Sequence, residues 1–295
     1  IDRLMQQMEE QGLIYPCQSE WAAYLVVVKK KDGSLRCCVD YRQLNERTVK
    51  DSYPLPRTDD CLDALSGAAI FSVFDLRSGY FQVEMDPRDA HKTAFVTKRG
   101  LYAWRVMSMG LCNAPATFQR LMDTTMLGLN FEICLVYLDD IILHSKDVKT
   151  HLERLRLLLE RLREANLKLK PTKCRLFQTA VSFLGYVVSA DGISTESSKF
   201  EAVQSWPQPR RLRDIRSFLG LCSYYRRFVP EFATIAAPLH ELTHKGRAFV
   251  WTQDCQTAFD ELKQRLTESP ILSLPRDGCR YVIDTDASDH GIGAV

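Results

Sequence analysis

The stretch FEICLVYLDDIILHSK, residues 131–146, places two adjacent carboxylates between two apolar runs. Apolar residues on both sides of a short polar break indicate a strand, a tight turn and a second strand. A two-residue hairpin turn usually contains Asn-Gly or Asp-Gly, whereas Asp139 and Asp140 bring like charges together without a glycine. Two interpretations stay open from these residues: the turn is merely solvated, or its charges face a cation.

A third carboxylate, Asp75, ends another apolar run in the segment FSVFDLRSGY, residues 71–80. If both runs are strands of one sheet, their aspartates reach the same edge and can hold divalent metal ions between them. Two-metal sites use carboxylate oxygens around ions about 3.5–4 Å apart, and Mg²⁺ prefers such oxygen ligands. The three carboxylates therefore indicate nucleotidyl transfer, with capped or solvated turns as the structural alternative.

The bulk properties are those of a globular chain with room for two or more packed units. The 295 residues are 45% hydrophobic and 26% charged, which are ordinary values. No apolar run reaches 18 residues and the N-terminus resembles no signal peptide, so we expect neither a membrane span nor secretion. The ten cysteines show no CxxC pair and no zinc spacing, which predicts reduced, intracellular thiols.

The net charge is only +2, but the basic residues are clustered. Residues 29–50 hold seven bases against three acids, residues 146–175 ten against four, and residues 199–227 seven against two. Basic stripes that alternate with acidic spots suit a nucleic-acid groove around a cation site. Solvated helix faces would give the same pattern, so charge alone leaves both interpretations open.

Apolar periodicity predicts an α+β region with an antiparallel sheet over about residues 54–190, and helices from 198. Helices are expected near residues 1–12, 58–67, 113–128, 148–165, 198–206, 215–222 and 251–274. Strands are expected at residues 25–28 and 35–39, on both sides of a bend in 69–85, in 131–146, in 181–193, and at the start of 281–295. Thr58 and a Ser198–Glu201 capping box are expected to begin two of the helices. In the helix at 148–165 the predicted apolar face is Leu152, Leu155, Leu159 and Leu162.

Five segments resemble the pol polyprotein of gypsy-type long-terminal-repeat retrotransposons. They are FSVFDLRSGYFQVEM (71–85), KTAFVTKRGLYAWRVMSMGLCNAPATFQRLM (92–122), VYLDDIILHSK (136–146), FLGYVVSADGI (183–193) and IRSFLGLCSYYRRFVPEFATIAAPL (215–239). The resemblance implies a right-hand polymerase, the reverse transcriptase. Its parts would be fingers over 1–53 and 87–105, palm over 54–86 and 106–190, thumb over 191–245, tether over 246–277, and an incomplete ribonuclease H-like start over 278–295. The chain would then be a piece of a longer polyprotein.

The same resemblance implies a role for each matching residue. Asp75, Asp139 and Asp140 would bind two Mg²⁺ ions, with Mn²⁺ as an alternative, and Asp140 would be the most peripheral. The nucleotide-binding residues would be Lys30, Arg36, Tyr80, Met109 and Gln119, with Tyr80 excluding a ribose 2′-hydroxyl. Tyr137, Gly185 and Tyr186 would hold the primer, and arginines at 210–227 would contact phosphates. Asp286 would be a first ribonuclease H ligand, whose partner carboxylates would lie beyond Val295.

The implied activity is DNA synthesis on RNA and DNA templates, from a primer and deoxynucleoside triphosphates, inside the cell in a cytoplasmic particle or the nucleus. Two segments depart from the family pattern. SEWAAY (19–24) lacks two prolines, and MSMGL (107–111) has Ser108 and Met109 where the family has Pro and Phe. Two alternatives therefore stay open: an inactive or domesticated copy that only binds nucleic acid, and a chain named for a ribonuclease H domain that is truncated here.

Overall fold

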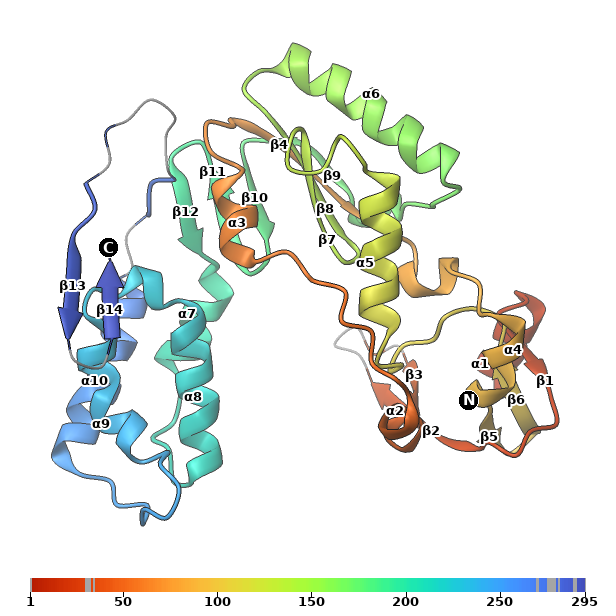
Figure 1. Cartoon of the computed structure of the whole chain (residues 1–295), viewed down its shortest axis with the longest axis horizontal. Helices are drawn as coiled ribbons and strands as arrows, with labels where there is room; N and C mark the ends of the chain where they lie inside the picture. The colour runs from red at the N-terminus through yellow and green to blue at the C-terminus, as the bar shows by residue number, and fades with distance from the viewer. Residues whose placement is uncertain are drawn as a thin grey trace. The chain divides into compact units, whose positions relative to one another are not determined.

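The central sheet brings the two aspartate-ending strands into contact. In the computed structural model, which describes residues 2–29, 33, 35–268, 271–274, 280, 282–288 and 291–294, β4 (Ile70–Asp75) pairs antiparallel with β8 (Asp140–Ser145). β7 (Cys134–Tyr137) lies beside β8, and β9 (Arg175–Gln178) lies on the other side of β4. The order β7-β8-β4-β9, with every pair antiparallel, confirms the predicted type of sheet (Figure 1).

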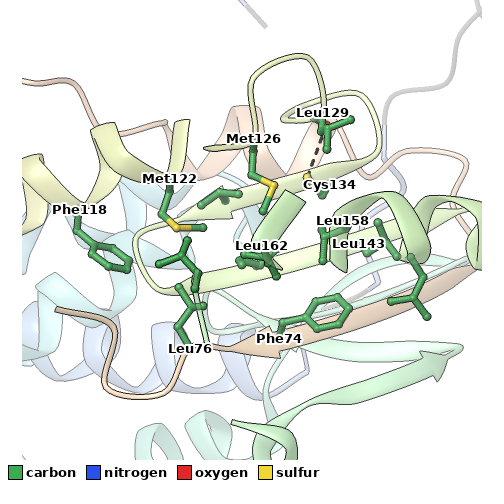
Figure 2. Close-up of a cluster of buried hydrophobic side chains, with 14 of the residues drawn as sticks. Phe74, Leu76, Phe118, Met122, Met126, Leu129, Cys134, Leu143, Leu158 and Leu162 are labelled. Atoms are coloured by element: carbon green, nitrogen blue, oxygen red, sulfur yellow. Dashed lines mark hydrogen bonds between the residues drawn. The ribbon is translucent and has the colours of Figure 1, made fainter. Parts of the chain in front are cut away.

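Two helices cover one face of this sheet. α5 (Ala114–Thr125) and α6 (Val148–Glu164) bury apolar side chains against the strands. Figure 2 shows side chains of both helices and of the strands in one apolar cluster, among them Phe118 and Met122 of α5, Leu158 and Leu162 of α6, Phe74 of β4 and Leu143 of β8. Each fully buried side chain of this kind contributes about 1.5–3 kcal/mol, so this apolar layer fixes the strands whose ends carry the aspartates.

The prediction for the apolar face of α6 is partly wrong. Leu155 and Leu162 are buried as expected, but Leu152 is 58% exposed and Leu159 is 41% exposed, and Leu158 lies in the core instead. The helix has leucines on two overlapping stripes, both with helical spacing. Periodicity alone cannot select the stripe that faces the sheet.

A second sheet combines strands that precede β4 in sequence with two strands that lie between β4 and β7. Its strand order is β1 (Ile14–Pro16), β6 (Gly100–Trp104), β5 (Phe95–Thr97), β2 (Ala23–Lys29) and β3 (Leu35–Asp40). The predicted hairpin is confirmed, because β2 and β3 pair antiparallel. The expected first helix is α1 (Asp2–Glu10), whose Met5 and Met8 pack with Trp104 in a separate apolar core. Between β3 and β5 the chain also forms short helices: α2 (Arg42–Arg47), α3 (Thr58–Asp63), α4 (Pro87–Ala90) and the 3-10 helix η2 (His91–Thr93).

The described residues form two compact units that divide between Leu184 and Gly185, with Leu65–Gly67 assigned to the second unit. The palm–thumb boundary expected from the sequence lies later, after residue 190. The first unit also contains η3 (Pro171–Lys173) and β10 (Ala180–Phe183).

The second unit is mainly helical. Its elements are β11 (Tyr186–Ser189), β12 (Gly192–Thr195), α7 (Ser197–Gln204), α8 (Leu212–Tyr224), η4 (Arg226–Phe228), α9 (Phe232–Glu241), α10 (Gln253–Thr267), β13 (Thr285–Ser288) and β14 (Gly291–Ala294). The predicted stripe of α8 is confirmed, since Ile215, Phe218, Leu219 and Cys222 are all buried. The rings of Phe218 and Phe259 lie 4.6 Å apart and join α8 to α10.

Three local predictions are wrong. The chain after Asp75 forms the 3-10 helix η1 (Gly79–Gln82) instead of a second strand, and only an isolated bridge joins Glu84 to Val106. Thr58 is the first residue of α3 rather than its cap. The capping box lies at Arg211 and Asp214, before α8, and not at the start of α7. Residues 83–85 pair with residues 105–107 only over this short stretch, while the backbone of residues 78–83 hydrogen bonds locally and forms the 3-10 helix.

Two further expectations concern the described part of the chain. Its nine cysteines are all free of disulfide bonds. None of its helices is both long enough and apolar enough to cross a membrane.

Candidate active site

Asp75 and Asp140 lie directly opposite each other at the end of the central sheet. The register of β4 and β8 pairs these two residues, and the register of β7 and β8 pairs Tyr137 with Asp140. Leu138 and Asp139 therefore form the tip of the hairpin, where Leu138 has the left-handed φ of +55°. Such a conformation is unfavourable for a residue other than glycine. The hairpin thus places Asp139 and Asp140 at the same sheet edge as Asp75.

The carboxylates at this edge affect each other electrostatically. The pKa of the Asp140 carboxyl is raised, first by loss of solvation and then by the negative charges of Asp139 and Asp75. The Asp140 residue as a whole is exposed, and the two neighbouring negative charges lie at the same sheet edge. Repelling carboxylates are stabilised by a nearby cation.

Lys173 supplies one positive charge at this place. Its Nζ lies 2.7 Å from Oδ2 of Asp75, and 56% of the Lys173 side chain and 26% of the Asp75 side chain are exposed. The positive charge of Lys173 also lowers the pKa of Asp140, as a smaller effect that opposes the other three. Lys173 was not among the predicted site residues, although it lies in the basic segment 146–175.

The donor set fits an open metal site rather than a closed one. No three His, Cys, Asp or Glu side chains of the described residues converge closely enough to enclose an ion by themselves. Mg²⁺ usually keeps several waters and is bound by one or two carboxylates together with substrate phosphates. Asp75 and Asp140, which pair across β4 and β8, and Asp139 at the hairpin tip are the candidate oxygen ligands for such an open site.

Gly79 packs against this edge and was not predicted as a site residue. A Cβ atom at Gly79 would lie 3.1 Å from Cζ of Phe118 and 3.2 Å from Cβ of Asp139. Both distances are shorter than ordinary contacts of 3.4–4 Å. The close approach of η1 to the hairpin therefore depends on the absence of a side chain at this position.

Tyr80, the next residue, lies between the core and Asp139. Its ring meets the Phe118 ring edge-on at 5.3 Å. Burial, and secondly the charge of Asp139, raise the pKa of the Tyr80 hydroxyl. Phe81 instead packs against Trp104, with ring centroids 5.0 Å apart. Of these two aromatic residues, Tyr80 is thus the one beside the carboxylates.

The expectation that Gln119 faces the nucleotide is contradicted by its burial. The side chain is 0% exposed. Its Oε1 accepts a hydrogen bond of 2.7 Å from the backbone N–H of Leu138, and its Nε2 donates to Asp123 and to the carbonyl of Val136. Both polar atoms of the side chain are thus hydrogen bonded inside the protein. Gln119 therefore stabilises the hairpin tip instead of contacting a nucleotide.

For the other predicted site residues the structure gives the exposure or the strand pairing. Tyr137 and Met109 are partly exposed, while Ser108 beside Met109 is buried. Arg36 lies in β3, opposite Val28; Lys30 lies outside the described residues. Asp286 pairs with Gly293 in the hairpin of β13 and β14.

Two predicted primer contacts lie at the start of the second unit. Tyr186 is 2% exposed, so its side chain is unavailable in this structure for the expected contact. Its hydroxyl donates to the carbonyl of Tyr224, and its ring packs on Tyr225 and Phe228. Gly185 has a φ of +78°, and its carbonyl accepts a hydrogen bond from the Tyr225 hydroxyl. An aromatic residue in a strand can either pack in the core or bind a ligand. The sequence does not show which of these two roles Tyr186 has.

Comparison with known proteins identifies the family and the fold. Residues 28–188 match the profile described as "Reverse transcriptase (RNA-dependent DNA polymerase)". Residues 251–295 match an "RNase H-like domain found in reverse transcriptase", which begins within the expected tether. The chain belongs to the reverse transcriptase family.

Among curated relatives, the Pol polyprotein from transposon 297 of Drosophila melanogaster is 42% identical over 302 residues, which cover 100% of this chain and 28% of the relative. The Pol polyprotein from transposon gypsy of the same species is 34% identical and covers 100% of this chain and 30% of the relative. The chain thus spans about a third or less of the length of these relatives. They confirm the predicted kinship with gypsy-type retrotransposons.

Solved structures show the same fold. The foamy viral protease-reverse transcriptase in complex with dsDNA has a TM-score of 0.87 and 26% identity, over 97% of this chain and 60% of that chain. The same viral protein in complex with an RNA/DNA hybrid has a TM-score of 0.84 and 25% identity, over 97% of this chain and 39% of that chain. The predicted right-hand polymerase fold is confirmed.

Proposed function

We propose that this chain extends a primer with deoxynucleoside triphosphates on RNA and DNA templates. The observation that carries the proposal is the pairing of Asp75 with Asp140 across β4 and β8, with Asp139 at the joining tip. Membership of the reverse transcriptase family supports it. As in the relatives, the activity would belong to a longer Pol polyprotein.

Reverse transcriptases generally use divalent metal ions. In this chain Asp75 and Asp139 would hold them, with Asp140 more peripheral, and the ions would be Mg²⁺ or Mn²⁺. When bound, such ions activate the attacking hydroxyl and stabilise charge on the leaving pyrophosphate. The chain itself contributes the orientation: the β4–β8 register fixes Asp75 and Asp140, and Gly79 and Gln119 fix the tip with Asp139.

The nucleotide would bind beside this edge. Tyr80 lies between Phe118 and Asp139, which supports a role in excluding a ribose 2′-hydroxyl. Arg36 and Lys30 would contact the triphosphate, since a guanidinium suits bidentate phosphate contact and an ammonium acts as a point charge. Met109 would contact the base, and Tyr137 and Gly185 would lie near the primer.

The template and primer would be held mainly through their phosphates. The foamy viral structures contain dsDNA and an RNA/DNA hybrid, which supports the same class of ligand here. Exposed arginines in the second unit can supply such contacts: Arg210, Arg211, Arg213, Arg216, Arg226 and Arg227. Phosphate contacts position a duplex without reading its sequence and weaken with salt.

The test is primer extension on a poly(rA) template with an oligo(dT) primer, in Mg²⁺ or Mn²⁺. Asp139→Asn is the matched control, because it keeps the size of the side chain and removes the metal-binding charge. We expect extension by the wild type only; equal signals from both proteins would refute the proposal. Retained template–primer binding without extension would instead support the inactive copy, for which Met109 in place of Phe is the motivating observation.

Two smaller proposals accompany this one. Degradation of an RNA–DNA hybrid by this chain would favour the alternative in which the chain acts as a ribonuclease H. The intracellular location stays a prediction, which imaging of a tagged chain in its host cell would test.

A further inference from the structure

The edge of the central sheet beside the active site is completed by side chains rather than by another strand. β7 is the outermost strand on that side, so its outward backbone groups need other partners. Gln119 bonds to the N–H of Leu138 and the carbonyl of Val136, and Asn130 Oδ1 accepts from the N–H of Val136 at 3.2 Å. Two side-chain amides thus take the place of a neighbouring strand next to Asp139.

Asp123 accepts a hydrogen bond from each of these two side-chain amides. Its Oδ1 accepts a hydrogen bond of 3.0 Å from Nε2 of Gln119 and one of 3.2 Å from Nδ2 of Asn130. Carboxylate oxygens only accept, and the Leu138 N–H only donates. The Gln119 amide therefore has a single orientation that satisfies all its partners, with Nε2 toward Asp123 and Oε1 toward Leu138.

Tyr53 holds Asp123 from the other side. The Tyr53 hydroxyl donates to Oδ2 of Asp123 at 2.8 Å. This bond, as the largest effect, raises the pKa of the tyrosine. The Arg120 guanidinium lies 4.6 Å from the centre of the Tyr53 ring and pairs with Asp51 at 2.7 Å. The segment that follows α2 is thereby connected to α5 and, through it, to the hairpin tip.

We infer that Asp123 is a positioning residue for the catalytic hairpin, acting through Gln119 and Asn130 on the edge of β7 and clamped by Tyr53. Leu138 is held at a left-handed φ, and such strain persists only where the surroundings over-determine it. The three bonds to Asp123 supply that constraint. The effect of Asp123 on catalysis rests on the proposed polymerase function. The hydrogen bonds that join Asp123 to the hairpin do not depend on that proposal.

The variants separate this role from simple destabilisation. Asp123→Ala removes the acceptor for all three donors. Asp123→Asn keeps an oxygen for Gln119 and Asn130, and its amide can donate to the Tyr53 hydroxyl, which can also accept. Tyr53→Phe removes only the clamp. Thr125→Ala on the same helix is the matched control, because its partly buried hydroxyl bonds only to the carbonyl of Leu121.

The first measurement is hydrogen exchange of peptides spanning residues 134–141 in the metal-free chain. We expect Asp123→Ala to speed exchange in this peptide about tenfold, because the two amides that bond to the hairpin edge lose their shared acceptor. Tyr53→Phe should speed exchange about threefold, and Asp123→Asn and Thr125→Ala should stay close to wild type. Unchanged exchange in Asp123→Ala, or a loss in Asp123→Asn as large as in Asp123→Ala, would overturn the inference. Should Asp123→Ala fail to fold, the Tyr53→Phe result decides, and unchanged exchange there overturns it.

The second measurement is single-turnover incorporation of one nucleotide, with template–primer affinity measured separately. We expect Asp123→Ala to lower the maximal rate about tenfold while the dissociation constant for template–primer changes less than about twofold, because small displacements of a catalytic group affect the rate most. Asp123→Asn should restore most of the rate. Equal losses of rate and affinity would point to general disorder and contradict the inference. A wild type that extends no primer would refute the proposed function, and the exchange measurement would still decide the positioning role.

Discussion

Gly79→Ala is the sharpest test of how tightly the active site is packed. The added Cβ would lie 3.1 Å from Cζ of Phe118 and 3.2 Å from Cβ of Asp139, so these neighbours must shift by a few tenths of an ångström. Phe118 is 0% exposed and surrounded by core residues, and Cβ of Asp139 moves only with its backbone. The hairpin tip is therefore expected to move away from η1.

The size of the effect follows from these distances. A displacement of about 1 Å at a reacting group can cost about a hundredfold in rate, so a shift of a few tenths should lower the rate about threefold to tenfold. Overpacking by one methyl should also cost about 1–3 kcal/mol of stability. Template–primer affinity should stay within about twofold of wild type, because the contact lies at the carboxylates and not in the basic segments.

The assay is single-turnover primer extension at saturating nucleotide, together with thermal unfolding. Gly220→Ala in α8 is the control for unfolding, because a Cβ there would meet nothing within 4 Å. That control should not lower the unfolding midpoint, since alanine favours a helix over glycine by about 0.5–1 kcal/mol. A Gly79→Ala variant with the wild-type rate and midpoint would refute the reasoning from close packing.

Three further predictions concern stability. Lys173→Met should cost less than about 1 kcal/mol in urea unfolding of the metal-free chain, because the pair with Asp75 is partly exposed; a loss above about 2 kcal/mol would contradict this. Gln119→Leu should cost about 1–3 kcal/mol, because the Leu138 N–H loses its acceptor, and an unchanged unfolding midpoint would argue against the support role. Burial lowers the pKa of His144 from 6.5 to about 4, so the unfolded chain takes up a proton first as the pH falls. About 2 kcal/mol should be lost between pH 7 and pH 5, and His144→Gln should lose clearly less in urea unfolding at the two pH values.

The sequence allowed the three carboxylates to be predicted because their chemistry depends on residue type and on the ends of strands. Asp75 and Asp140 each lie at the end of an apolar run, and the structure pairs them as expected. Gln119 was assigned to the nucleotide because a polar residue on a helix near the site gives no sign of the direction it faces. Its burial depends on the left-handed Leu138 and on Asp123, which are brought together only by folding.

Other site features depend on distances that a sequence does not contain. Gly79 has no positive φ, so no turn pattern marks it, and its role follows from the approach of Phe118 and Asp139. Lys173 is one of ten basic residues in the segment 146–175, and nothing in the sequence distinguishes it from the others. Only its contact with Asp75 in the folded chain does so. Tyr186 fits a primer contact by motif, yet its side chain is buried among the aromatic residues of the second unit.

The position of β4 between β8 and β9 also determines when the active site can form during synthesis. The strand with Asp75 is made early, but its two neighbours begin only at Asp140 and Arg175. A strand cannot pair until its partner strands have been synthesised, and pairing between segments far apart in sequence slows folding. A nascent chain that ends before about residue 178 therefore lacks one side of its central strand. On the ribosome, the carboxylates should become a folded site only after most of the first unit has emerged.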